Sequence, residues 1–187
     1  MGQFSFIETP IEGLYVIETK AFGDHRGYFM ETYNYNDFKN AGLKMKFVQD
    51  NQSKSTKGVL RGLHFQKKYP QGKLVRVLNG EVFDVAVDLR KDSKTFGKWY
   101  GLILSGENKK QFYIPEGFAH GFLVLSDEAE FAYKCTDFYH PEDEGGLIWN
   151  DNQIGIKWPV GSINNLILSD KDRNWPQFRE LDFVFDL

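Results

Sequence analysis

The sequence predicts an all-β protein, an antiparallel sandwich or barrel with a few short peripheral helices, and three observations support this prediction. Between Phe47 and Tyr139 the chain is a series of short runs of Val, Ile, Leu, Phe and Tyr, separated by Gly, Asn, Asp or Pro. Aromatic residues make up 16% of the chain, and such residues favour sheets. Helical periodicity is confined to two short segments.

The bulk composition fits a single domain over residues 1–187 that needs neither disulfides nor metals for stability. Cys135 is the only cysteine, so no intrachain disulfide can form, and a buried apolar position is expected for it. A net charge of -3 argues against nucleic acid as a partner. Met1–Pro10 has neither a basic region nor a long apolar run, so we expect no signal peptide, no membrane partner and a cytoplasmic location.

The clearest local elements in the first half of the chain are one helix and one hairpin. Asn36–Leu43 predicts a short helix that ends near Gly42. Lys73–Leu78 and Glu81–Leu89 are two strand-like runs around Asn79-Gly80. Because this dipeptide tolerates the positive φ angles of a type I′ turn, a hairpin is predicted there.

The second arm of that unit alternates with period two. Phe83, Val85, Val87 and Leu89 share one face, which we expect to be core. The other face carries Val82, Asp84, Ala86 and Asp88. Two carboxylates among small residues fit the polar interior of a barrel, and a solvated outer face is the alternative.

Near the C-terminus, Ser169–Trp175 predicts a capped turn in which Ser169 supplies the N-terminal oxygen. The last residues, Trp175–Leu187, are aromatic and acidic, and we expect them to pack back on the body.

His64, in Arg61-Gly62-Leu63-His64-Phe65-Gln66, is the leading candidate for a general base, because imidazole accepts a proton near neutral pH without extreme tuning. It needs a carboxylate partner to fix its tautomer, and Asp84, Asp88 and Asp172 are all candidates. A structural histidine is the alternative.

Two cations lie close to His64 in the sequence. Arg61 suits bidentate contact with phosphate, and Lys73 can act as a point charge, although surface ion pairs would use the same residues. Strict alternation would place Arg61 and His64 on opposite faces of a strand. A shared pocket therefore requires a bulge or turn at Gly62.

Tyr133 lies in the expected strand Glu130–Cys135, and its phenol could donate a proton to a developing enolate. A packing role is the alternative. A base and an acid on opposite sides of a substrate is the geometry that inversion of configuration requires.

The segment Pro115–His120 resembles the second sequence motif of cupins, in which the histidine is a metal ligand. Metal-binding cupins also have His-x-His in their first motif, whereas this chain has His64-Phe65-Gln66. With one imidazole instead of two, the usual ligand set cannot be assembled, so no metal is expected.

Taken together, these segments resemble the dTDP-4-dehydrorhamnose 3,5-epimerases over nearly the whole chain. The resemblance rests on several motifs in the right order: Phe22–Glu31, Phe47–Asn51, Leu60–Gln66, Gln71–Arg76, Gly80–Asp88, Ile114–Phe122 and Leu147–Asp151. The chain departs from the family's usual pattern at His25, where the family commonly has Glu.

The resemblance implies a cupin-like jelly roll (double-stranded β-helix barrel) that forms a homodimer and needs no cofactor. The implied reaction converts dTDP-4-dehydro-6-deoxy-α-D-glucose to dTDP-4-dehydro-β-L-rhamnose by inverting C3 and C5, in dTDP-L-rhamnose biosynthesis. By the same resemblance, His64 is the base, Asp172 its partner and Tyr133 the acid on the other face.

The resemblance also assigns ten residues to substrate contact, with Tyr139 stacking on the thymine: Arg26, Glu31, Gln49, Asn51, Arg61, Lys73, His120, Tyr139, Glu144 and Lys171. Three alternatives to the double epimerase remain open at this point. They are a 3- or 5-mono-epimerase of a related deoxysugar pathway, a metal-dependent cupin enzyme, and a non-catalytic sugar-binding sandwich.

Overall fold

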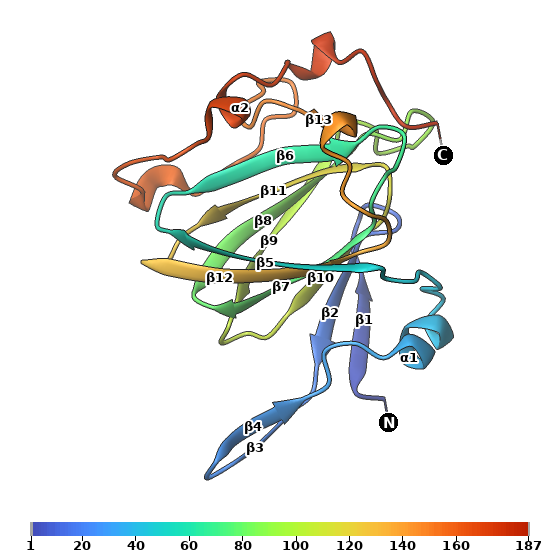
Figure 1. Ribbon diagram of the computed structural model, residues 1–187, viewed down its shortest axis with the longest axis vertical. Helices are drawn as coiled ribbons and strands as arrows, with labels where there is room; N and C mark the ends of the chain where they lie inside the picture. The colour runs from blue at the N-terminus through green and yellow to red at the C-terminus, as the bar shows by residue number, and fades with distance from the viewer. Residues whose placement is uncertain (1, 187) are drawn as a thin grey trace.

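The computed structural model describes residues 2–186 and confirms the all-β prediction, with two antiparallel sheets stacked on each other (Figure 1). One sheet has the strand order β1 (Phe4–Glu8), β2 (Tyr15–Thr19), β10 (Gln111–Ile114), β7 (Lys73–Asn79), β12 (Glu128–Cys135) and β5 (Gln49–Thr56). The other has the order β13 (Glu144–Gly146), β6 (Leu60–Gln66), β11 (Phe118–Val124), β8 (Glu81–Asp88) and β9 (Trp99–Ser105). A separate hairpin of β3 (Ala21–Asp24) and β4 (Gly27–Met30) projects from the body, at the bottom of Figure 1.

Alternate residues of the two sheets fill the space between them. Val82 and Ala86 of β8 pack there with Val75 of β7 and Phe112 of β10. Asp84 shares the inward face of β8 and is fully buried. The prediction of a polar interior is therefore confirmed at β8, and the alternative of a solvated outer face is wrong.

The opposite, apolar face of β8 is covered by the C-terminal segment. The backbone N–H of Phe185 donates to the carbonyl of Leu89 at 2.9 Å, and the rings of Phe183 and Phe185 lie against Phe65. The expectation that the C-terminal segment packs on the body is confirmed over residues 175–186.

The predicted hairpin of β7 and β8 is wrong. Both runs are strands, but β7 lies between β10 and β12 in one sheet, whereas β8 lies between β11 and β9 in the other. The Asn79-Gly80 turn is thus an arch between the two sheets. Gly80 has a φ of 79°, and a Cβ there would lie 2.0 Å from the carbonyl oxygen of Glu128. A dipeptide that suits a tight turn also suits this arch, so local sequence could not distinguish them.

Both predicted helical segments are confirmed as shorter helices, and the first begins one residue earlier than predicted. α1 (Tyr35–Asn40) is capped by the side chain of Asn34 and buries Phe38. α2 (Asp170–Arg173) is capped by Ser169, whose Oγ accepts a hydrogen bond from a backbone N–H. The described residues also form three 3-10 turns, η1 (Pro141–Asp143), η2 (Val160–Ser162) and η3 (Phe178–Glu180). None of the helices within residues 2–186 has the length and apolar character needed to cross a membrane.

Candidate active site

A bulge in β6 turns Arg61 and His64 toward the same side of the sheet. The pairs His120–His64 and Phe122–Arg61 leave two residues of β6 opposite one residue of β11. Gly62 has a φ of 125°, and a Cβ there would lie 2.6 Å from a backbone carbon of β11. Only glycine fits so close an approach. The irregularity predicted at Gly62 is confirmed.

A cavity of about 160 Å³ opens between the two sheets at this bulge. Its lining comes from β5, β6, β7, β11 and β12: Ser53, Arg61, His64, Lys73, His120, Gly121, Phe122, Phe131 and Tyr133. Groups that can accept protons, donate protons and carry positive charge therefore meet in one space.

His64 is bound to Asp172, which α2 brings to the five-stranded sheet. The distance from His64 Nε2 to Asp172 Oδ1 is 2.5 Å. Because a carboxylate only accepts hydrogen bonds, Nε2 is the protonated nitrogen and Nδ1 carries the free lone pair. Asp172 also accepts from the Ser169 hydroxyl at 2.8 Å and the Trp175 indole at 3.4 Å. Burial raises the pKa of Asp172, but these hydrogen bonds outweigh it and hold the pKa below its usual value.

A second histidine, His120, is bound to Asp84 on the neighbouring strand. Its Nε2 lies 3.0 Å from both carboxylate oxygens. Burial raises the pKa of Asp84, although His120 and Lys73 oppose that shift. Burial also lowers the pKa of His120 and of Lys73. The remaining candidate, Asp88, instead binds the side chains of a nearby loop.

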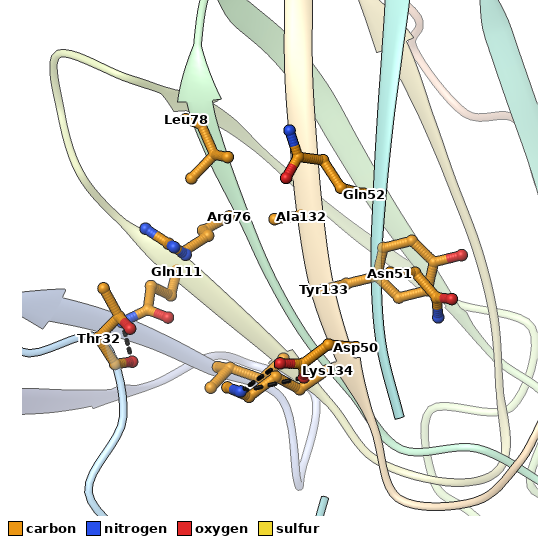
Figure 2. A pocket seen from close by; sticks show the side chains of 11 residues that line it. Thr32, Asp50, Asn51, Gln52, Arg76, Leu78, Gln111, Ala132, Tyr133 and Lys134 are labelled. Carbon is orange, nitrogen blue, oxygen red and sulfur yellow. Dashed lines mark hydrogen bonds and ion pairs between the residues drawn. The ribbon is translucent and has the colours of Figure 1, made fainter. Parts of the chain in front are cut away.

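Tyr133 enters the cavity from the six-stranded sheet. It pairs with Asn51 of β5 and Val75 of β7. Figure 2 shows a larger hollow, of about 500 Å³, at the six-stranded sheet. The side chains of Tyr133 and Asn51 point to one side of this sheet, and the side chain of Arg76 points to the other. Burial is the main cause of a raised pKa for the Tyr133 phenol. The phenol therefore stays protonated at neutral pH and can act as a proton donor.

Four further predicted residues form one hydrogen-bonded group beside His64. The backbone N–H of Tyr139 donates to the side chain of Gln49 at 3.0 Å, and the Tyr139 hydroxyl donates to Glu144 at 3.2 Å. Lys171 donates to the same carboxylate oxygen of Glu144. The other oxygen of Glu144 lies 4.0 Å from Nδ1 of His64. A fifth, Asn51, accepts from the amide of Gln49 at 3.0 Å.

Arg26 and Glu31 are the two predicted contacts that lie neither in the cavity lining nor in this hydrogen-bonded group. Arg26 lies at the tip of the β3–β4 hairpin, where it pairs with Asp24 and its side chain is 79% exposed. Glu31 follows β4 and accepts from the side chain of Asn34 at 3.1 Å.

Sequence reasoning missed several side chains of this site. Ser53, Phe122 and Phe131 line the cavity, and Trp175 supports Asp172. Ser53 could have been found, because it lies two residues after Asn51 in the same strand. The position of Trp175 against the backbone of Gly146 depends on tertiary packing.

Gln66 stands where metal-binding cupins have a second histidine, and its side chain here binds backbone groups of two loops. Its amide nitrogen donates to the carbonyls of Tyr69 and Phe138, and its oxygen accepts from the backbone of His140. Within residues 2–186, no three His, Cys, Asp or Glu side chains are grouped as a metal site.

The fold and the cavity together define the class: a cupin-like jelly roll whose interior presents an imidazole–carboxylate pair opposite a phenol. A family model described as dTDP-4-dehydrorhamnose 3,5-epimerase matches residues 8–180. The chain belongs to this family of sugar-nucleotide epimerases.

Relatives and solved structures agree with this membership. The dTDP-4-dehydrorhamnose 3,5-epimerase of Methanothermobacter thermautotrophicus is 58% identical over 96% of this chain and 97% of that protein. The crystal structure of the Elizabethkingia anophelis enzyme of the same name has a TM-score of 0.92 at 52% identity, covering 97% of this chain and 100% of that one. A Legionella pneumophila epimerase in complex with dTDP-4-keto-L-rhamnose has a TM-score of 0.88 at 56% identity, covering 90% of this chain and 89% of that one.

Proposed function

We propose that this protein is an isomerase that converts dTDP-4-dehydro-6-deoxy-α-D-glucose to dTDP-4-dehydro-β-L-rhamnose by inverting C3 and C5. The observation that carries the proposal is the His64–Asp172 pair facing the same cavity as the phenol of Tyr133. Similarity to epimerases of this name over nearly the whole chain supports the choice of substrate.

The chemistry rests on the C4 ketone, which acidifies the protons on both neighbouring carbons. His64 removes a proton through the lone pair of Nδ1, and the electrons of the broken C–H bond move into the carbonyl to form an enolate. Asp172 holds the imidazole in the required tautomer and stabilises the imidazolium. Tyr133 then donates its proton to the carbon from the opposite face, which inverts the centre.

Lys73 and His120 supply the electrostatic part of the mechanism. Both line the same cavity as His64 and Tyr133. The ammonium of Lys73 would stabilise negative charge on the enolate oxygen. A preorganised charge in a water-poor site is worth far more than the same charge in water. Asp84 fixes the ring of His120 toward this group.

Recognition of the nucleotide falls to residues around the mouth of the cavity. Arg61, held by the Ser55 hydroxyl at 3.1 Å, offers a guanidinium to the diphosphate. The half-exposed ring of Tyr139 is available to stack on the thymine, next to Gln49 and Glu144.

The predicted homodimer explains the position of Arg26 and Glu31. We propose that the β3–β4 hairpin of one copy reaches the substrate site of the other. The hairpin projects from the body (Figure 1) and exposes Phe22, Tyr28 and Phe29, which suits a surface that another copy covers.

Subunit mixing tests this arrangement. His64→Ala and Arg26→Ala proteins should each be impaired, whereas a mixture after subunit exchange should recover about a quarter of the wild-type activity, since half of the mixed dimers' sites are intact. A mixture no more active than its components contradicts a shared site.

The reaction itself is tested by incubating the protein with the 4-ketosugar nucleotide in deuterated water. NMR should find deuterium at both C3 and C5 of the product. Deuterium at one carbon would assign a mono-epimerase, and retention of both protons would overturn the proposal.

A further inference from the structure

Inverting two carbons imposes a requirement that inverting one does not. At each carbon one proton passes from the substrate to His64, and one passes from Tyr133 to the substrate. After the first inversion the imidazole is protonated and the phenol is a phenolate. Both groups must be reset before the same pair can act on the second carbon, so a proton has to leave His64 while the sugar remains bound.

The structure offers one acidic side chain at the nitrogen that holds this proton. Nε2 of His64 is occupied by Asp172, and Nδ1 faces Glu144 Oε1 at 4.0 Å. The two atoms are not hydrogen-bonded at this distance, and a small rotation of either side chain would bring them within the roughly 3.2 Å that direct proton transfer requires. The Glu144 side chain is 12% exposed, so a small part of it reaches solvent.

The far side of Glu144 leads to solvent. Its Oε2 accepts hydrogen bonds from the Tyr139 hydroxyl and from Lys171, and the Lys171 side chain is 51% exposed. The hydrogen bond with Glu144 raises the pKa of Lys171, so the ammonium persists. Water around this half-exposed ammonium can take up a proton from the carboxylate beside it.

We propose that Glu144 is the proton relay that removes the proton from His64 between the two inversions and passes it to solvent beside Lys171. This inference rests on the proposed function. The proton balance is closed: His64 Nδ1–H gives its proton to Glu144 Oε1, water takes it from Glu144, and the phenolate of Tyr133 takes one proton from solvent. Glu144 acts through His64, in addition to the substrate contact that family resemblance assigns to it.

Glu144→Gln is the informative variant, because glutamine keeps the size and the hydrogen-bond acceptor for Tyr139 and Lys171 but cannot relay a proton. The experiment is a single turnover in deuterated water with enzyme in excess, in which mass spectrometry counts deuterons per sugar over time. The measured quantity is the ratio of the second deuteron's rate to the first. A change in substrate affinity alters both rates and leaves this ratio unchanged.

The wild-type protein should add both deuterons at similar rates. In Glu144→Gln the ratio should fall about tenfold, toward the low end of general acid–base effects, and a singly deuterated sugar should accumulate. Raising the concentration of acetate or imidazole at fixed pD and ionic strength should restore the ratio, since a diffusing base replaces the relay. Glu142→Gln is the matched control, because this exposed residue pairs with His140 away from the cavity, and it should match the wild type.

Three outcomes separate the possibilities. Equal slowing of both deuterons without a response to buffer would make Glu144 a binding residue only and overturn the relay. Wild-type rates for both deuterons would also overturn it. If the wild-type protein adds no deuterium at all, the proposed function is wrong, whatever Glu144 does.

Discussion

Two histidine–aspartate pairs lie side by side on β6 and β11, and they are built in different ways. His64 and His120 are partners in the strand register. His64 receives its carboxylate from Asp172, 108 residues away in the C-terminal segment, and its side chain is 29% exposed. His120 receives its carboxylate from Asp84 on the adjoining strand, and its side chain is 9% exposed.

The two aspartates differ in the direction of their pKa shifts. Hydrogen bonds from three side chains hold the pKa of Asp172 below its ordinary value despite burial, whereas burial raises the pKa of Asp84. A stable carboxylate suits a partner that must stabilise an imidazolium. The His120–Asp84 pair joins two adjacent strands of one sheet, so its side chains are held in a fixed position. The first pair is thus equipped to move protons, and the second to set the electrostatics around them.

The largest expected effect is on turnover. Asp172→Asn should lower kcat by about a thousandfold, because the amide can stabilise neither the imidazolium nor the required tautomer. Asp84→Asn should lower kcat by only about tenfold, since His120 takes no proton from the substrate. Steady-state kinetics compare the two variants, with the exposed Asp170→Asn as control. Equal losses in both variants would remove the distinction between the pairs.

The next effect is on stability and concerns the buried Asp84 pair. Asp84→Ala leaves His120 and Lys73 without their buried counter-charge, and breaking such a pair costs about 3 kcal/mol. Asp50→Ala, which removes an exposed partner of Lys134, should change the free energy of unfolding by less than about 1 kcal/mol. Urea unfolding measures the free-energy change in each variant. Similar losses in the two variants would show that the buried Asp84 pair contributes no more to stability than an exposed ion pair.

Tyr133→Phe removes the acid and leaves the His64 pair intact. Completed inversion should slow by about a hundredfold, while His64 still removes protons. Loss of a tritium label from C3 or C5 of the substrate reports that removal, and polarimetry reports inversion. Tyr100→Phe, in the same core but outside the cavity lining, is the control. Full activity in Tyr133→Phe would exclude the phenol as the donor.

The smallest effect is the pH dependence of stability, and here the pairs should differ in sign. Asp172 has a lowered pKa, so its contribution is fully present above the unfolded value near 3.9 and is lost as the pH falls through the folded value. Asp84 has a raised pKa, so the folded state binds more protons, and stability falls as the pH rises from the unfolded value through the folded one. Comparing the unfolding free energies of the wild type, Asp172→Asn and Asp84→Asn between pH 3 and 7 should reveal pH dependences of opposite sign. Slopes of the same sign contradict the assigned directions.

Much of this molecule could be predicted from its sequence because the signals were local. The strand runs and the cap at Ser169 follow from residues within a few positions of each other. The bulge at Gly62 followed from requiring Arg61 and His64 to share a pocket, and the inward face of β8 from its alternation. The choice of Asp172 over Asp84 and Asp88 came from family resemblance alone.

What could not be predicted depends on how distant segments pack. Asn79-Gly80 has the composition of a hairpin turn, and only the choice of partner strands makes it an arch between sheets. No pattern around His120 indicated that Asp84 would bind it, because the two meet through β8–β11 pairing. Nor did spacing indicate that Glu144 would approach His64, since β13 joins the edge of β6 from far along the chain.

The most direct test of the central claim compares the two histidines in deuterated water. NMR of the product formed by the wild type should show deuterium at C3 and C5, His64→Ala should show it at neither carbon, and His120→Ala should show it at both but more slowly. Deuterium at either carbon with His64→Ala, or at neither with His120→Ala, would contradict the assignment of proton removal to His64.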